Sequence, residues 1–280
     1  MSLEHQLSTT DLSLGYGPRT IVENLNLSIP AGKLTVIVGA NACGKSTLLR
    51  GLARLLAPRH GAVYLDGKSV HKLPTREVAT ILGVLPQTPV APDGITVADL
   101  VGRGRYPHQG WFRQWSAVDD AAVAEALEAT DTLDLATRPV DELSGGQRQR
   151  VWIAMALAQQ TDLLLLDEPT TFLDINHQVE VLDLLTDLVR TKGRTVVVVL
   201  HDLNLGCRYA DHIVAMKGGS IAAEGPPSAV ITTEVVREVF AIESEVLIDP
   251  FSGSPMIVPI GRHHGRPREE ACAVLESVRL

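Results

Sequence analysis

The stretch that decides the fold is GANACGKST, residues Gly39–Thr47. Two glycines, Gly39 and Gly44, are separated by four residues and followed by Lys45 and Ser46. This pattern is typical of a loop that surrounds phosphate groups. The glycines let the backbone bend, the lysine brings a positive charge to the β and γ phosphates, and the serine offers a hydroxyl to Mg²⁺. The residues expected to form this phosphate loop are Gly39, Ala40, Asn41, Ala42, Cys43, Gly44, Lys45, Ser46 and Thr47.

The segments on either side of the loop support this interpretation. The run Leu34–Val38 is apolar and predicts a buried strand. After the loop, Leu48, Leu49, Leu52 and Leu55 recur at helical spacing. The loop is therefore expected between a strand and a helix N-terminus, where free N–H groups and the helix dipole favour anions. A chance glycine-rich turn is the alternative, and the flanking pattern argues against it.

Composition limits the classes of function. A chain of 280 residues can form one large or two small domains, and 45% apolar with only 4% aromatic residues predicts an aliphatic core. The net charge of −8 argues against generic binding to nucleic acid or to an acidic membrane surface. Cys43, Cys207 and Cys272 lack metal-site spacing and suit a reducing compartment. For Cys43, a small residue that fits the loop is the simpler interpretation and a redox switch the alternative.

No targeting segment is predicted. The first residues, MSLEHQLSTTDLSL, lack the apolar core of a signal peptide. The longest apolar stretches, at Leu163–Leu166 and Thr195–Leu200, are too short to span a bilayer. A soluble, cytoplasmic protein is expected.

Hydrophobic periodicity divides the chain into three parts. The first part predicts β-strands, the segment from about Thr96 to Gln160 predicts helices, and strands and helices alternate afterwards. The simplest architecture is an α/β fold with a parallel sheet flanked by helices and interrupted by a helical insertion. The end of the chain, from Gly261, is polar and charged at first and is expected to be loosely ordered. The adjacent His263 and His264 lack a third ligand nearby, so a metal site is not expected there.

Two further motifs match a nucleotide site. In LSGGQRQR, a predicted helix begins at Ser144, Gly145 and Gly146. The serine hydroxyl and the unhindered N–H groups of the glycines can bind an anion. Ordinary helix capping would also explain the serine. In LLLLDEP, a predicted strand ends in Asp167, which can hold Mg²⁺ through water. The next residue, Glu168, can orient or deprotonate a water that attacks a γ phosphate. Adjacent acids that cap the next helix are the structural alternative.

Together these motifs resemble the ATP-binding cassette (ABC) ATPases. The phosphate loop, LSGGQRQR, LLLLDEP, FLD and LHD occur in that family's order and approximate spacing, over nearly all of residues 1–260. The resemblance implies an ABC-type P-loop NTPase with a RecA-like mixed sheet core, an antiparallel β subdomain and a helical subdomain. It assigns residues 1–88 and 162–260 to the RecA-like core and β subdomain, residues 89–161 to the helical subdomain, and 261–280 to a C-terminal tail.

The resemblance also implies roles for four further residues. Tyr16 of LGYG would stack on adenine, and Gln87 of VLPQ would reach Mg²⁺ and the attacking water. Asp174 of FLD would lie at the seam of a dimer, and His201 of LHD would contact the γ phosphate. Tyr16 could instead be a core aromatic residue, Gln87 a turn residue and His201 a satisfied histidine at a strand end.

One departure from the family pattern concerns the phosphate loop. Ala40 and Ala42 stand where the family usually has proline and glycine, and alanine at position 42 must tolerate a backbone conformation that glycine adopts freely. ATP binding is still expected. In the family, two chains face each other head to tail, so ATP held by Lys45 of one chain is covered by Ser144 and Gly146 of the other. Hydrolysis is therefore expected to need a homodimer.

The cargo is suggested by a more distant likeness. The sequence shows no membrane span, second cassette or long heptad insertion, which leaves a separate importer subunit. The stretches VGRGRYPHQGWF and DEPTTFLDINHQ resemble the ATPase subunits of ferric-siderophore importers, whose relatives carry vitamin B12 or haem. The implied partners are two membrane permease subunits and, indirectly, a substrate-binding protein, at the cytoplasmic face of the cell membrane. The alternative from another class is a soluble ABC ATPase acting on nucleic acid or ribosomes.

The same insertion suggests a docking surface. We expect Arg103, Arg105, Tyr106 and Trp111 to contact the permease, because exposed aromatic residues beside arginines favour interfaces. A solvated loop is the alternative.

Overall fold

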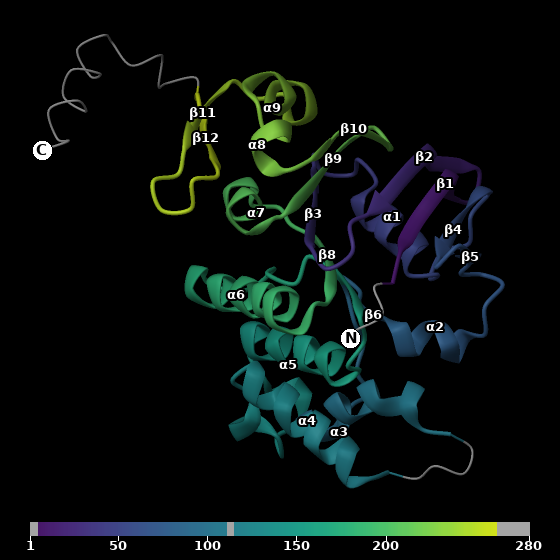
Figure 1. The fold of residues 1–280 in the computed structure, drawn as a ribbon. Helices are drawn as coiled ribbons and strands as arrows, with labels where there is room; N and C mark the ends of the chain where they lie inside the picture. Colours follow the sequence, from purple (N-terminus) through teal and green to yellow (C-terminus); the bar gives the residue numbers. More distant parts are fainter. Residues whose placement is uncertain (1–4, 111–114, 262–280) are drawn as a thin grey trace, which may run out of the picture.

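The computed structural model describes residues 5–110 and 115–261 (Figure 1). Its centre is a six-stranded sheet in the order β10-β9-β3-β8-β7-β6. β3 pairs in parallel with β8 and β9, β7 pairs in parallel with β6 and β8, and β10 is antiparallel to β9. The strands are β3 (Leu34–Gly39), β6 (Leu82–Leu85), β7 (Leu163–Asp167), β8 (Thr195–Val199), β9 (His212–Lys217) and β10 (Ser220–Gly225). The mixed α/β sheet expected from the sequence is confirmed.

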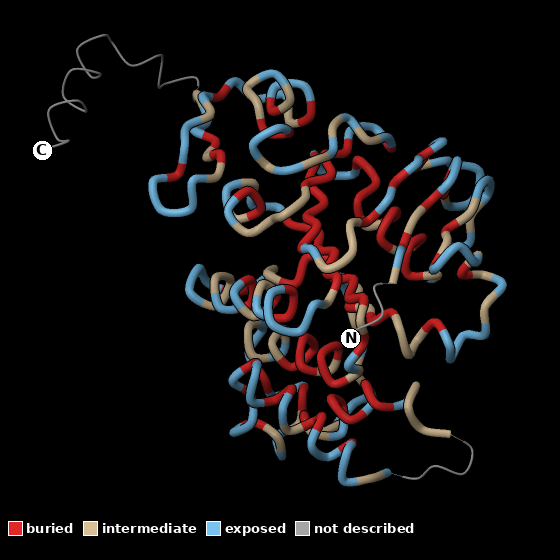
Figure 2. The backbone as a smooth tube through the Cα atoms, in the orientation of Figure 1, coloured by how far each residue is buried: buried red, intermediate tan, exposed pale blue. Residues whose placement is uncertain are grey.

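The central sheet is buried on both faces. All residues of β3, β7 and β8 are buried, and Figure 2 shows these strands as a continuous buried column. Because successive side chains alternate across a strand, Val36 joins the core on one face and Ile37 the core on the other. This explains why the β3 sequence reads as an unbroken apolar run.

A second sheet lies beside the first and has the order β2-β1-β4-β5. Its strands are β1 (Leu7–Tyr16), β2 (Arg19–Ile29), β4 (His60–Leu65) and β5 (Lys68–Ser69), and all neighbouring pairs are antiparallel. Helix α1 (Lys45–Leu52) packs between the sheets, with Leu48, Leu49 and Leu52 buried in their shared core. The expected helix is therefore confirmed, but it ends before Leu55, which is 60% exposed.

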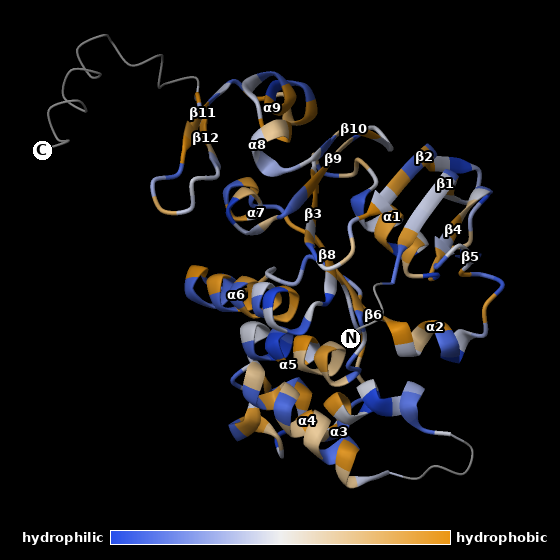
Figure 3. Cartoon of the chain, viewed as in Figure 1, coloured by the Kyte–Doolittle hydropathy of each residue, from blue (hydrophilic) through white to orange (hydrophobic). Residues whose placement is uncertain are grey.

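Helix α2 (Thr75–Ile81) contributes Val78 to the same core as α1. The other helices cover the opposite face of the central sheet and extend beyond it (Figure 1). They are α3 (Val97–Gly102), α4 (Ala117–Ala129), α5 (Gly145–Ala158), α6 (Ile175–Lys192), α7 (Leu203–Tyr209), α8 (Pro227–Val230) and α9 (Thr233–Phe240). The segment from Thr96 to Gln160 is mainly helical, as the sequence predicted. In Figure 3, α6 shows apolar and polar faces, and its buried Val181, Leu182 and Leu185 belong to the core.

The described chain closes with a hairpin of β11 (Ser244–Ile248) and β12 (Pro255–Pro259). Asp249, in the turn of this hairpin, accepts hydrogen bonds from the Phe251 backbone, the Ser252 hydroxyl and Arg208. These bonds lower the pKa of Asp249 to about 2, and the bond from the Phe251 backbone N–H has the largest effect.

Residues 262–280, which include His263 and His264, lie outside the described residues. Within the described ranges, no helix has both the length and the apolar composition needed to cross a bilayer.

The structure corrects the expectation for Arg105. This residue lies in the 3₁₀ helix Arg103–His108 and is only 3% exposed, so it neither belongs to a solvated loop nor can contact a partner directly. Its Nε donates to Asp119 Oδ1 at 3.0 Å, and its Nη1 donates to the Ala158 carbonyl at 2.7 Å and to Gln160 Oε1 at 3.0 Å. Arg105 therefore joins this turn to α4 and to the end of α5. Tyr106 beside it is 60% exposed, and Trp111 lies outside the described residues.

Replacing Arg105 by alanine should destabilise the fold. The substitution leaves the buried Asp119 carboxylate without its cation, and breaking a buried ion pair typically costs about 3 kcal/mol or more. Urea unfolding should show this loss in Arg105→Ala, while Arg103→Ala, at an exposed position in the same turn, stays within about 0.5 kcal/mol of the parent. Equal stability of the two variants would contradict this structural role.

Candidate functional site

The phosphate loop connects β3 to α1. Lys45 is 5% exposed, and its Nζ donates to the carbonyls of Gly39 at 2.8 Å and Ala40 at 3.1 Å, which holds the ammonium group inside the loop. Gly39 is required for close approach, since a Cβ there would lie 2.4 Å from the Met216 carbonyl oxygen. The loop thus presents a cation and the first N–H groups of α1 to the same space.

Ala42 has the left-handed conformation that its place in the sequence led us to expect. Its φ is 61°, a region that costs a residue with a Cβ roughly 1–2 kcal/mol relative to glycine. Two residues later, Gly44 has a φ of 109° at the start of α1. The neighbouring Cys43 is 7% exposed, and burial raises the pKa of its thiol although Lys45 opposes the shift. Burial agrees with the interpretation of Cys43 as a small residue that fits.

Asp167 ends β7 beside the phosphate loop. The Ser46 hydroxyl donates to Asp167 Oδ1 at 2.9 Å, across 121 residues of sequence. Asp167 is 1% exposed, and its Oδ2 has no hydrogen-bond partner among the described residues. Burial raises the pKa of this carboxyl group, and the bond from Ser46 partly opposes the shift. A buried carboxylate oxygen without a partner next to a serine hydroxyl is the oxygen-donor arrangement that Mg²⁺ requires.

Glu168 is held between two residues from other parts of the chain. Its Oε1 lies 2.7 Å from Nε2 of His201, and its Oε2 accepts a hydrogen bond of 2.8 Å from Nε2 of Gln87. Glu168 is 8% exposed, and its φ of 55° lies in the left-handed region. Its partners differ from those of the adjacent Asp167, which accepts a hydrogen bond from Ser46. The structure therefore brings together Gln87, Glu168 and His201, which the sequence had singled out separately.

Residues of the phosphate loop, together with Gln87, Glu168 and His201, line one open cavity of about 520 Å³. Its lining consists of Tyr16, Arg19, Ile21, Asn41, Ala42, Gly44, Lys45, Ser46, Thr47, Gln87, Glu168 and His201. A cavity of this size can hold a nucleotide. Tyr16 is 45% exposed at its rim, which excludes a core role, and its hydroxyl accepts a hydrogen bond from Arg50 Nη1 at 3.2 Å.

Two lining residues, Arg19 and Ile21, carry no motif that marks them in the sequence. They reach the cavity because β2 turns back beside β1, which places Arg19 opposite Tyr16 in the strand register. Alternation along β2 could have indicated which of its residues share a face. It could not have indicated that this face meets the phosphate loop.

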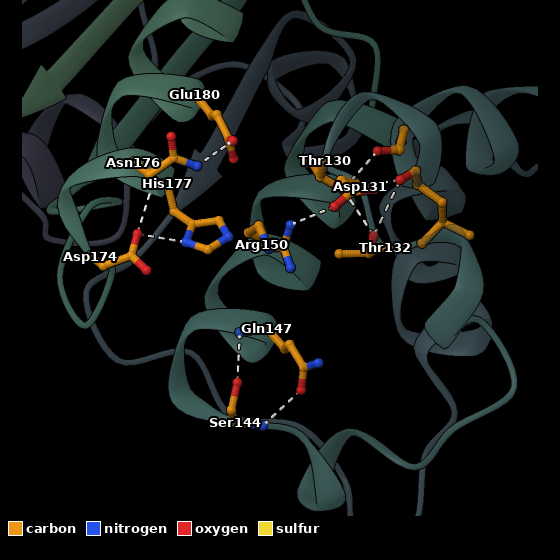
Figure 4. A network of polar contacts seen from close by, with 12 residues as sticks. Thr130, Asp131, Thr132, Ser144, Gln147, Arg150, Asp174, Asn176, His177 and Glu180 are labelled. Carbon is orange, nitrogen blue, oxygen red and sulfur yellow. Dashed lines mark hydrogen bonds and ion pairs between the residues drawn. The ribbon is translucent and has the colours of Figure 1, made fainter.

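The serine-glycine motif lies apart from this cavity, as does Asp174. Ser144 caps α5: its hydroxyl accepts from the Gln147 N–H at 3.3 Å, and its own N–H donates to Gln147 Oε1 at 3.1 Å (Figure 4). Asp174 caps α6 by accepting from the His177 N–H at 3.0 Å, and it contacts His177 Nδ1 at 2.7 Å (Figure 4). Ordinary capping therefore occurs at both positions. Ser144, Gly145 and Gly146 are not among the lining residues of the cavity.

Comparison with known proteins relates this site to transport. Residues 22–171 match the family model described as "ABC transporter". The chain is 56% identical to the probable siderophore transport system ATP-binding protein YusV of Bacillus subtilis, over 97% of this chain and 96% of that protein. It is 50% identical to the ferric enterobactin transport ATP-binding protein FepC of Escherichia coli, over 92% of this chain and 95% of that protein.

A solved structure with the same fold contains a dimer. It is the post-hydrolysis state of the ATP-binding cassette MJ0796, a dimeric structure bound to ADP and phosphate. The TM-score is 0.71 at 29% identity, with 79% of this chain and 98% of that chain covered. The expected fold class is confirmed.

Replacing Ala42 by glycine should stabilise the subunit. Relief of the left-handed conformation outweighs the entropy that glycine adds to the unfolded chain, so a gain of up to about 1 kcal/mol is expected. Ala40→Gly is the matched control, because the φ of Ala40 is not positive and glycine there brings only the entropic loss. Thermal unfolding of the two variants should show shifts of opposite sign. A loss of stability in Ala42→Gly would contradict the strain.

Proposed function

The chain belongs to the ABC transporter family as an ATP-binding subunit. From this premise, we propose that it hydrolyses ATP to drive uptake of a ferric siderophore through a separate membrane permease. The observation that carries the proposal is the convergence of Lys45, Ser46, Asp167, Glu168 and His201 on one side of the phosphate loop. The cargo is inferred from the relatives, whose names refer to siderophore and ferric enterobactin transport.

The chain offers distinct groups to the parts of ATP. Lys45 and the first N–H groups of α1 would hold the β and γ phosphates, and Tyr16 at the rim would stack on the adenine. Ser46, Asp167 and Gln87 would hold Mg²⁺. When bound, Mg²⁺ supplies positive charge that stabilises the phosphate oxygens during transfer.

Glu168 is the group best placed to activate water. In the hydrolysis step, the oxygen of water attacks the γ phosphorus, the bond from phosphorus to the ADP oxygen breaks, and Glu168 accepts the proton that the water loses. Gln87 would orient the water, and His201 would contact the γ phosphate. The hydrogen bond from Gln87 and the contact with His201 hold both oxygens of Glu168 at the cavity before the substrate binds.

A second copy of the chain would complete the site. Ser144, Gly145 and Gly146 offer a helix N-terminus, yet they do not line their own cavity. In a head-to-tail homodimer they would cover the ATP bound to the partner, with Asp174 at the seam. The dimeric ADP-bound relative supports this arrangement.

The dimer would sit beneath two permease subunits at the cytoplasmic face of the membrane, and the cargo would reach the permease from a substrate-binding protein. Within the proposed division, residues 1–88 and 162–260 form the RecA-like core and β subdomain, and residues 89–161 form a helical subdomain, part of which would dock on the permease. The exposed Arg103 and Tyr106 remain candidates for docking, without Arg105. Nucleic acid is not a proposed partner, since the net charge is −8.

Replacing Glu168 by glutamine should separate binding from hydrolysis. The amide keeps the size of the side chain but cannot accept the proton, so turnover should fall by roughly 10²–10⁴ while ATP still binds. The measurements are phosphate release and ATP binding by the isolated subunit. Hydrolysis at the parent rate would show that another group activates the water.

The transport assignment is tested by coupling to a permease. A permease that co-purifies with this chain should raise its ATPase rate in membrane vesicles and should take up radioactive ferric siderophore only when ATP is supplied. RNA and DNA serve as controls and should leave the rate unchanged. Uptake of haem or vitamin B12 in place of the ferric chelate would revise the cargo, and stimulation by nucleic acid alone would contradict an importer.

A further inference from the structure

The loop that carries the chain from Glu168 to Asp174 is held from outside by two amide side chains. Gln149, on α5, donates from Nε2 to the Pro169 carbonyl at 2.9 Å. Gln178, on α6, donates from Nε2 to the Leu173 carbonyl at 3.1 Å. Pro169 directly follows Glu168, so the bond from Gln149 acts next to the proposed catalytic base.

The loop has little to hold it in place by itself. Glu168 and Phe172 have φ values of 55° and 68°, which residues with side chains rarely adopt. Phe172 is 80% exposed, so its ring adds little packing. The internal hydrogen bonds are long, at 3.2 Å from Thr171 N to the Glu168 carbonyl and 3.3 Å from Leu173 N to the Thr170 carbonyl. Such a strained segment persists only where its surroundings fix it.

Helix α5 also lies close to the loop at its first turn. A Cβ added at Gly145 would lie 3.7 Å from Phe172 Cβ, and one added at Gly146 would lie 3.5 Å from Leu173 Cδ2. The two segments therefore approach so closely that one added methyl group would bring them into contact, and the side chain of Gln149 bridges them with a directional bond. The N-terminal turn of α5 and the loop after Glu168 form one linked unit.

We infer that Gln149 is a positioning residue for the hydrolytic step: its hydrogen bond to the Pro169 carbonyl holds the loop so that Glu168 faces the γ phosphate. The inference rests on the proposed function, which gives Glu168 its role. It has a consequence for the dimer. Because α5 begins at Ser144, which would contact the ATP bound to the partner, Gln149 links that contact to the catalytic base of its own chain.

The test compares two amides of the same helix. Gln149→Met keeps the length of the side chain but removes the donor, and kcat should fall about five- to tenfold while KM and the Kd for ATP stay within about twofold. Gln159→Met is the matched control: Gln159 caps the far end of α5 and donates to the Ala79 carbonyl at 2.7 Å. It loses the same kind of bond, but far along the helix from Glu168, so its kcat should match the parent's. An equal fall in kcat in the two variants would overturn the inference.

A double-mutant cycle separates positioning from a general loss of structure. Gln149→Met should reduce turnover in the parent but not in the Glu168→Gln background, because a residue that acts through Glu168 has nothing left to position. The same fold reduction in both backgrounds would contradict the inference. An inactive parent protein would instead count against the proposed function.

Gln149→Glu covers the case in which the methionine variant does not fold. Its carboxylate cannot donate to the Pro169 carbonyl and repels it, so kcat should fall at least as far as in Gln149→Met, with ATP binding retained. Loss of ATP binding in both variants would show that Gln149 supports the fold as a whole, and would overturn the positioning role.

Discussion

The hydrogen bond between the Ser46 hydroxyl and Asp167 Oδ1 is the contact on which the rest of the site depends. It joins the first turn of α1 to the end of β7, two elements separated by more than a hundred residues of chain. The parallel sheet makes this contact possible, because β3 and β7 run in the same direction on either side of β8 and end at the same edge. Since both strands are buried on both faces, a shift in register would disrupt the side-chain packing on both faces and draw the polar groups at the strand ends into the core. The polar groups at their ends are therefore placed by the packing of the core.

Two residues with strained backbone conformations lie where the proposed chemistry takes place. Ala42 in the phosphate loop and Glu168 after β7 both have left-handed conformations that are unfavourable for residues with a side chain. At Ala42 this conformation shapes the loop, and Glu168 meets Gln87 and His201 while the adjacent Asp167 meets Ser46. The surrounding core and the amides of Gln149 and Gln178 supply the contacts that hold this geometry.

The sequence predicted the parts of the structure that depend on local pattern. The apolar run at Leu34–Val38, the glycine spacing and the amphipathic segments after residue 170 each carry their own periodicity, so the strands, the phosphate loop and the main helices could be predicted. Arg105 could not, because its burial depends on Asp119, Ala158 and Gln160, which only tertiary folding brings together. Arg19 and Gln149 could not be predicted either, because their roles also depend on tertiary folding. The strand register brings Arg19 to the cavity, and Gln149 is identified only by its hydrogen bond to the distant Pro169 carbonyl. Sequence motifs pointed to Lys45, Ser46, Gln87, Glu168 and His201, which line the cavity, but not to the residues that surround them.

The central claim, that two copies of the chain share each ATP site, is tested most directly by mixing two inactive variants. Lys45→Ala removes the phosphate-loop cation, and Ser144→Arg blocks the helix N-terminus that would cover the partner's ATP. A mixed dimer contains one site with both changes and one site with neither. ATP hydrolysis should therefore reappear on mixing, at up to about a quarter of the parent rate for random pairing and independent sites. A mixture no more active than its separate components would contradict a site built from two chains.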